Sequence, residues 1–210
     1  MISPTFKLER QLWRQGYRFV AGLDEVGRGA LAGSVVAGAV VFTPENGSGK
    51  GLSLLRKDNP LPLRDSKLLS PSQRERLAPL IKKRALAWAV GAVSQKVIDK
   101  IGIAAATERA MLKALSCLTV KPDFYLIDYF RLKSLPMEQQ LGVTDGDTLV
   151  SSIAAASVIA KVYRDSLLVK LHRTYPRYGF SQHKGYATAF HREALHRFGP
   201  CPLHRQSFLS

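Results

Sequence analysis

The sequence predicts an α/β protein, and three observations support this fold class. Apolar runs with the length and composition of β-strands cover residues 17–23, 30–42, 85–93 and 124–127. Longer segments with helical features alternate with them, at residues 4–15, 71–84, 98–118 and 151–173. Acidic residues follow two of the predicted strands, where α/β proteins usually place their ligand-binding groups. The length of 210 residues suits one domain, and we expect the basic C-terminal region, about 165–210, to belong to it.

The first predicted strand, residues 17–23, follows a short helix that ends at Gly16, and it leads directly into Asp24 and Glu25. Two neighbouring carboxylates at the end of a buried strand repel each other and are poorly solvated, so each resists ionisation. A bound cation removes both difficulties. Since neighbouring strand residues point to opposite faces, Glu25 can share such a cation only if the strand ends or twists there.

Gly27, Arg28 and Gly29 come immediately after these acids. Two glycines let the backbone approach a ligand closely, and the arginine between them adds a forked cation. An acidic pair suited to a metal and a tight loop suited to a phosphate indicate a nuclease. Each half alone is more often a plain surface turn, so the hypothesis needs further acids from elsewhere in the chain.

The next segments contain a hairpin partner, an insertion and a capped helix. Residues 30–42 should pair with the first strand through the glycine-rich loop. Residues 43–62 are rich in Gly, Ser, Asn, Pro and charge, which predicts a surface insertion. Ser70 followed by Pro71 predicts the start of a helix. Lys67, in the loop before it, is equally suited to contact a phosphate or to be a solvated lysine.

The second half of the chain supplies two more candidate acids. Residues 124–127 predict a short buried strand that ends in Asp128. On the long helix 151–173, Ser157, Lys161 and Asp165 are spaced i, i+4, i+8 and therefore share a face. Lys161 and Asp165 then form either a surface ion pair or part of the acidic site, and the second interpretation rests on the resemblance described below.

Charge and composition indicate a polyanionic partner. The formal net charge is +15, and residues 161–210 combine nine Lys and Arg and five His with two acidic residues and interleaved aromatics. No apolar run is long enough for a membrane span, which favours nucleic acid over a membrane surface. Cys117 and Cys201 show neither metal-ligand nor disulfide spacing, so we expect a reducing cytoplasm.

Several blocks of the sequence resemble bacterial ribonuclease HII, the type 2 ribonuclease H. They are residues 22–29 (GLDEVGRG), 65–70 (DSKLLS), 152–165 (SIAAASVIAKVYRD), 175–180 (YPRYGF), 183–186 (HKGY) and 204–208 (HRQSF). One departure lies beside a candidate acid, because the family commonly has glycine where this chain has Tyr129.

The resemblance implies a ribonuclease H-like mixed five-stranded sheet flanked by helices, with additional helices toward the C-terminus. It implies an endoribonuclease that hydrolyses the RNA strand of RNA–DNA hybrids and incises 5′ of ribonucleotides embedded in duplex DNA, leaving 5′-phosphate and 3′-hydroxyl ends. The acids that would hold two Mg²⁺ or Mn²⁺ ions are Asp24, Glu25, Asp128 and Asp165. The residues that would contact the nucleic acid are Gly27, Arg28, Gly29, Lys67, Lys161, Lys184 and Tyr186. We expect a monomer that does not bind membranes. The alternative hypothesis is a basic nucleic-acid-binding module without catalysis, which leaves the acids unexplained.

Overall fold

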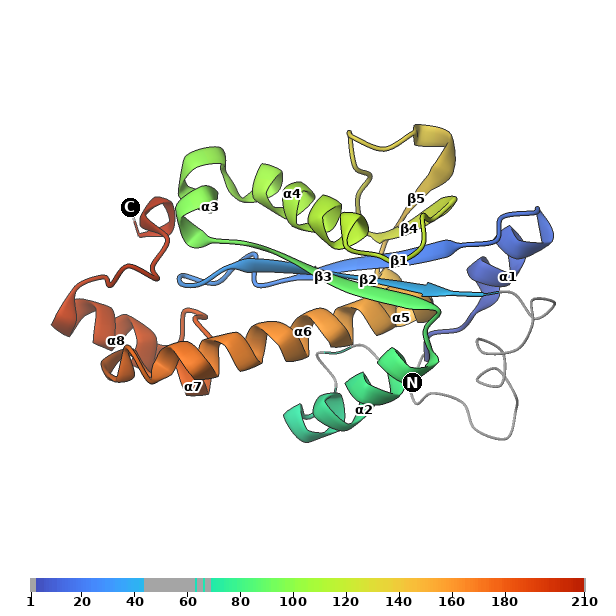
Figure 1. Ribbon diagram of the computed structural model, residues 1–210. Helices are drawn as coiled ribbons and strands as arrows, with labels where there is room; N and C mark the ends of the chain where they lie inside the picture. Colours follow the sequence, from blue (N-terminus) through green and yellow to red (C-terminus); the bar gives the residue numbers. More distant parts are fainter. Residues whose placement is uncertain (1–2, 44–62, 64–65, 67–68, 210) are drawn as a thin grey trace.

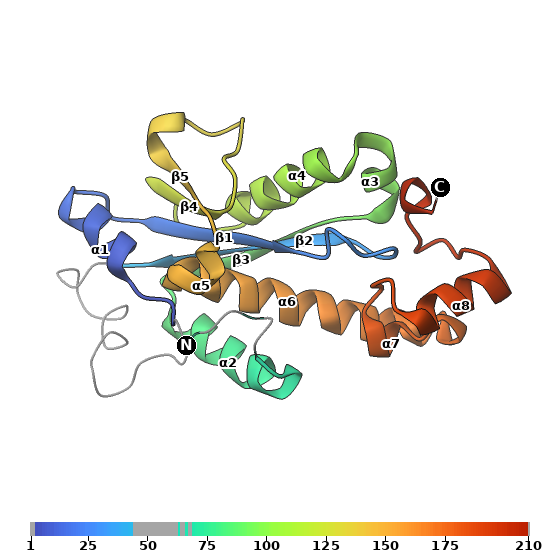
Figure 2. The ribbon, with the colours of Figure 1, turned by 180° about the vertical axis from the view of Figure 1, so that it is seen from behind.

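A five-stranded mixed sheet forms the centre of the computed structural model, with helices on both faces (Figures 1 and 2). The structure describes residues 3–43, 63, 66 and 69–209. The strand order is β3-β2-β1-β4-β5, and the strands are β1 (Val20–Val26), β2 (Val35–Phe42), β3 (Ala87–Val93), β4 (Phe124–Asp128) and β5 (Gln140–Val143). β1 pairs antiparallel with β2 and parallel with β4, β2 pairs antiparallel with β3, and β4 pairs parallel with β5. The expected fold class is confirmed.

The helices form two layers and a C-terminal extension. They are α1 (Lys7–Arg14), α2 (Pro71–Arg84), α3 (Gln95–Ile101), α4 (Ile103–Ser116), α5 (Gly146–Leu149), α6 (Ser151–His172), α7 (Phe180–His183) and α8 (Ala189–Phe198). Figure 1 shows α3 and α4 on one face of the sheet and α6 with α2 on the other, while α7 and α8 lie beyond one end of the sheet. Among the described residues, single 3₁₀ turns cover Met137–Gln139, Pro176–Tyr178 and Gln206–Phe208.

The long helix α6 lies directly against β1 and β2 because glycines and alanines line the contact. A Cβ added to Gly22 of β1 would lie 2.1 Å from the backbone of Ser152, and one added to Gly38 of β2 would lie 2.3 Å from the Ala156 carbonyl. The three alanines of α6 at this contact, Ala154 to Ala156, are fully buried. This close approach places α6 beside the strand that carries Asp24 and Glu25.

Local features of the sequence account for the helix ends. Ser70 caps α2, since its hydroxyl accepts a hydrogen bond from the Gln73 amide and the Gln73 side chain accepts one from the Ser70 amide. The predicted helix 98–118 is instead two helices. Gly102 has φ +79°, which is not a helical conformation, so the helix is interrupted between α3 and α4.

The first strand and the predicted insertion differ from the sequence expectations. The strand predicted at 17–23 is found at Val20–Val26, so both neighbouring acids lie within β1. Of the predicted insertion at 43–62, residues 44–62 lie outside the described residues, as does Lys67. No helix in the described part of the chain is long and apolar enough to cross a membrane.

Candidate active site

A hollow of about 510 Å³ lies where β1 and β4 end. The parallel register pairs Leu23 with Ile127, so the next residues of the two strands, Asp24 and Asp128, come level with each other. Both acids line the hollow together with Glu25. The other lining residues come from β1, α2, α6 and two loop positions: Val26, Arg74, Ser157, Lys161, Ser66 and Tyr186. Three of the four predicted acids are therefore brought together.

Asp24 is the most deeply placed acid of the hollow. Only 5% of the residue is exposed, and its carboxylate accepts a hydrogen bond of 2.6 Å from the Glu25 amide. Burial raises the pKa of Asp24 well above its ordinary value, and the negative charges of Glu25, Asp128 and Asp147 raise it further, against a hydrogen bond with Ser157 that lowers it. A nearby cation would reverse this penalty.

One carboxylate oxygen of Glu25 is suited to bind a cation. Although neighbouring strand residues leave opposite faces, Glu25 reaches the same hollow as Asp24. Burial raises the pKa of Glu25, while Arg28, with Nη1 3.3 Å from Oε1, lowers it. The other oxygen, Oε2, is buried and has no hydrogen-bond partner among the described residues. A buried carboxylate oxygen without a partner fits a hard divalent cation, which takes oxygen ligands.

A further acid near this hollow, Asp147, is absent from the set predicted from the sequence. Asp147 lies in the first turn of α5, is 3% exposed, and its charge contributes to the raised pKa of Asp24. The preceding residue, Gly146, donates its amide to Asp128 Oδ1 at 2.8 Å, which ties this turn to the end of β4. The sequence feature that could have revealed it is an Asp-Gly-Asp turn directly before the long helix.

The structure does not bring the fourth predicted acid, Asp165, to the other three. Its Oδ1 accepts a hydrogen bond of 2.9 Å from Lys161 Nζ, and its Oδ2 lies 3.8 Å from Arg74 Nη2. Asp165 lines a separate hollow of about 460 Å³, which it shares with Lys184. The physical reason is distance along the helix. Ser157 is the residue of α6 that forms a hydrogen bond with Asp24, and Asp165 is eight residues beyond it, or about 12 Å along the axis at 1.5 Å per residue.

As they stand, no three His, Cys, Asp or Glu side chains of the described residues are arranged to hold one metal ion. The donor set is nevertheless suitable, because it consists of carboxylate oxygens and includes the unpartnered Oε2 of Glu25.

Two buried arginines hold the Gly27–Arg28–Gly29 loop. Arg205 is fully buried and donates to the carbonyls of Gly27 and Arg28, both at 2.7 Å, and of Gly33. In a trans peptide the N–H points opposite to the C=O. Because the carbonyls of Gly27 and Arg28 point toward Arg205, the amides of Arg28 and Gly29 point away from it.

Arg164, on α6, packs beside Gly27 of this loop and binds the segment that follows the loop. It is fully buried and donates to the carbonyls of Ala32, Ser34 and Lys184. Gly27 has φ +89°, and a Cβ there would lie 2.1 Å from Arg164 Nε, so this position requires glycine. Gly29 has open space around a hypothetical Cβ. The basic residues Arg164 and Arg205 were part of the charged C-terminal region in the sequence, but nothing in their pattern indicated that they are buried.

The remaining predicted nucleic-acid contacts lie at different distances from the acids. The Tyr186 ring lines the acidic hollow, with Lys161 Nζ 5.4 Å and Arg164 Cζ 5.3 Å from its centroid. Lys161 lines it as well. Lys184 does not, and its Nζ donates to the carbonyls of Ser181 and Gln182.

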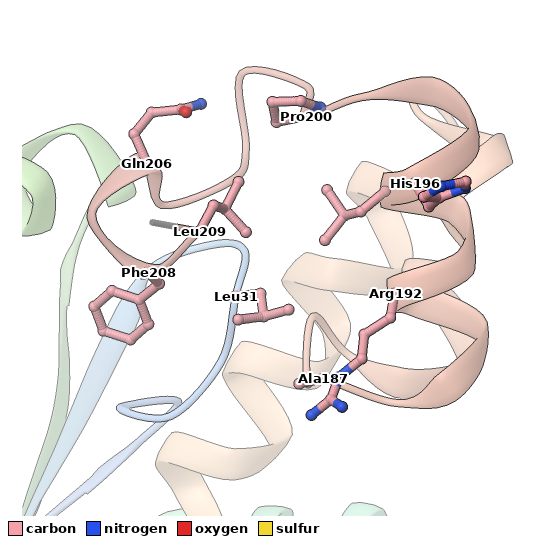
Figure 3. Close-up of a pocket in the computed structure, with 9 residues that line it drawn as sticks. Leu31, Ala187, Arg192, His196, Pro200, Gln206, Phe208 and Leu209 are labelled. Atoms are coloured by element: carbon pink, nitrogen blue, oxygen red, sulfur yellow. The ribbon is translucent and has the colours of Figure 1, made fainter.

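A larger hollow, of about 650 Å³, lies at the C-terminal end of the molecule between α8 and the last residues (Figure 3). Its lining includes Leu31, Arg192, His196 and Phe208 and contains no carboxylate side chain. Size alone therefore does not mark the site, whereas the group of acids around the buried Asp24 does.

Comparisons with known proteins agree with the sequence resemblance. The family model described as Ribonuclease HII matches residues 21–210. A curated relative named Ribonuclease HII, from Dehalococcoides mccartyi, is 46% identical over 207 residues, which is 99% of this chain and 93% of the relative. The crystal structure of ribonuclease H2 from Pyrococcus horikoshii is 26% identical with a TM-score of 0.71, covering 90% of this chain and 93% of that one. A structure of Bst-RNase HIII in complex with Mn²⁺ has a TM-score of 0.62 at 20% identity, over 87% of this chain and 63% of that chain, and shows a shared fold.

Proposed function

Since this chain belongs to the ribonuclease HII family, it is a metal-dependent endoribonuclease that acts on RNA–DNA hybrids, and we propose how its own residues perform the reaction. The proposal rests on the group of acids at the ends of β1 and β4, in which Asp24 is buried and Glu25 has a buried oxygen without a hydrogen-bond partner among the described residues. We propose that its substrates include duplex DNA with one embedded ribonucleotide. The enzyme would incise this duplex 5′ of the ribonucleotide and leave 5′-phosphate and 3′-hydroxyl ends.

We propose that Asp24, Glu25, Asp128 and Asp147 hold two divalent ions, Mg²⁺ or Mn²⁺. The support is electrostatic: Asp24 is buried beside the three other acids, which raises its pKa, so a cation is the partner that allows all four to ionise. Bound ions of this kind lower the pKa of a water nucleophile and stabilise the leaving oxygen. Before and during the reaction the protein's task is to keep these carboxylates ionised and aimed into one hollow.

Asp165 takes a different role in this proposal, as a residue that positions two cations. It is within 2.9 Å of Lys161 Nζ and 3.8 Å of Arg74 Nη2, and both cationic side chains line the acidic hollow. Fixing Lys161 and Arg74 beside the acids places positive charge where the scissile phosphate lies. Asp165 thereby acts through Lys161 and Arg74 rather than on a metal.

Recognition of the ribose is proposed for the loop held by Arg205. The amides of Arg28 and Gly29 donate to no acceptor among the described residues, and both residues are exposed. They are therefore suited to bind substrate oxygens, including the 2′-hydroxyl that distinguishes ribose from deoxyribose. The Tyr186 ring, which lies on Lys161 and Arg164, is proposed to pack against the adjoining deoxyribose.

A nicking assay on a duplex with one embedded ribonucleotide tests the proposal, with an all-deoxy duplex as the substrate control. Asp24→Asn and Asp147→Asn should each reduce cleavage by more than about 100-fold, because each removes a metal ligand, whereas Asp165→Asn should cost about 10-fold, the range of outer-shell changes. Raising the Mg²⁺ or Mn²⁺ concentration should not rescue Asp165→Asn. If Asp147→Asn cut as well as wild type while Asp165→Asn lost all activity, the proposed ligand set would be wrong.

A further inference from the structure

Tyr129, the residue that follows Asp128, combines a strained backbone with an exposed ring. Its φ is +67°, in the left-handed region that residues other than glycine rarely adopt. The residue is 72% exposed. We propose that Tyr129 and the hollow beside it form a substrate-binding site for a nucleotide next to the cleaved one, with the ring packed on its sugar or base. This inference rests on the proposed function, because it extends the same nucleic-acid path.

The strain has a clear local origin. The Phe130 amide donates to the Asp128 carbonyl at 2.8 Å, so Tyr129 is the central residue of a γ-turn. The Tyr129 amide donates to the Val143 carbonyl, also at 2.8 Å, which fixes the turn at the end of β4. This turn directs Phe130 toward the core and leaves the Tyr129 ring outside. A glycine would adopt this turn without steric cost, so the tyrosine adds backbone strain at this position.

The surroundings of the ring suit a sugar–phosphate chain. A hollow of about 400 Å³ lies beside Tyr129, and its charged lining consists of Arg28, Arg131 and Lys133 against the single acid Glu108. Glu108 is already engaged, since its Oε1 accepts hydrogen bonds from the amide and hydroxyl of Ser134 at 3.1 and 3.0 Å. Cations for phosphates beside an aromatic face for a sugar or base are the usual elements of single-strand contact.

Arg28 connects this hollow to the acids. Its Nη1 lies 3.3 Å from Glu25 Oε1, and its Cζ lies 5.8 Å from the centroid of the Phe130 ring. Tyr129 itself adjoins Asp128, which lines the acidic hollow. In this proposal, a nucleic acid strand whose scissile phosphate lies at Asp24 and Asp128 continues over Tyr129, and its phosphates then meet Arg131 and Lys133.

The test measures binding and stability in the same variants, because the proposal predicts that they change in opposite directions. Tyr129→Gly should raise the denaturation midpoint, since the strain is relieved, and should weaken binding of a single-ribonucleotide duplex about 10-fold in the presence of chelator, the loss expected for one stacking contact. Tyr129→Phe keeps the ring and should bind within about twofold of wild type. Trp88→Ala, which removes a partly exposed ring at the opposite edge of the sheet, should bind like wild type.

Duplexes that extend on only one side of the ribonucleotide locate the contact. The affinity loss of Tyr129→Gly should appear with one of the two duplexes and vanish with the other. Unchanged binding by Tyr129→Gly, a fall in its denaturation midpoint, or equal losses with both duplexes would each overturn the inference. Failure of the proposed function is a separate result, because it would appear as wild-type protein that binds the duplex and does not cut it in Mg²⁺ or Mn²⁺.

Discussion

The two glycines of the Gly27–Arg28–Gly29 loop should respond differently to substitution by alanine: Gly27→Ala should lower stability, whereas Gly29→Ala should lower cleavage without lowering stability. In Gly27→Ala the methyl group would meet Arg164 Nε at 2.1 Å in a backbone with φ +89°. The conformation alone costs about 1–2 kcal/mol for a residue with a Cβ. Displacing Arg164 also breaks its bond to the Ser34 carbonyl, a hydrogen bond to a charged group worth about 1.5–3 kcal/mol. We therefore expect the free energy of unfolding to fall by about 3–5 kcal/mol.

Gly29→Ala is the matched variant, because a methyl group there has nothing within 4 Å. The free energy of unfolding should stay within about 0.5 kcal/mol of wild type. Cleavage of a duplex with one ribonucleotide should nevertheless fall about 100-fold, since the methyl group keeps the substrate from the exposed loop and misplaces the scissile phosphate. Urea denaturation and kcat/KM measure the two effects. Cleavage by Gly29→Ala at the wild-type rate, or an equal loss of stability in both variants, would contradict these roles of the two glycines.

Two further predictions concern a buried acid and an aromatic contact. Glu9 is fully buried, and burial raises its pKa from 4.5 to about 7. Because the pKa is higher in the folded state than in the unfolded state, the contribution of Glu9 to the free energy of unfolding is fully present below about pH 4.5. This contribution falls by about 3 kcal/mol as the pH rises through 7. Glu9→Gln can still accept the Ser152 amide and should abolish this fall in urea titrations between pH 5 and 8, so an unchanged pH dependence would contradict the burial argument. Tyr186→Ala should lose more cleavage on a duplex with one ribonucleotide than on a continuous hybrid, whereas equal losses would mean that the ring only packs on Lys161 and Arg164.

Features that repeat along the chain could be predicted from the sequence. The apolar runs located β1 to β4, although the first strand extends through Asp24 and Glu25 and ends at Val26. The Ser70 cap correctly placed the start of α2, because capping is a local interaction between neighbouring residues. The strand ends also indicated Asp24, Glu25 and Asp128 as neighbours, since parallel strands bring their carboxyl ends to one edge.

Features that depend on packing could not be predicted in the same way. Asp147 lies in a four-residue helix without any periodic pattern, so only the fold shows that it faces Asp24. Asp165 shares a helix face with Ser157, but the pattern does not show that the turn of Ser157 is the one that lies beside Asp24. Arg164 and Arg205 resembled surface cations, because a charge count cannot distinguish a buried guanidinium that is satisfied by carbonyls from a solvated one.

The proposed reaction requires divalent ions in the hollow at the ends of β1 and β4. Crystals grown with Mn²⁺ and measured at its absorption edge would locate the ions directly. We expect anomalous density among the carboxylates of Asp24, Glu25, Asp128 and Asp147, with Asp165 still bound to Lys161. Density at Asp165 instead, or an empty hollow at a Mn²⁺ concentration that supports cleavage, would contradict the claim.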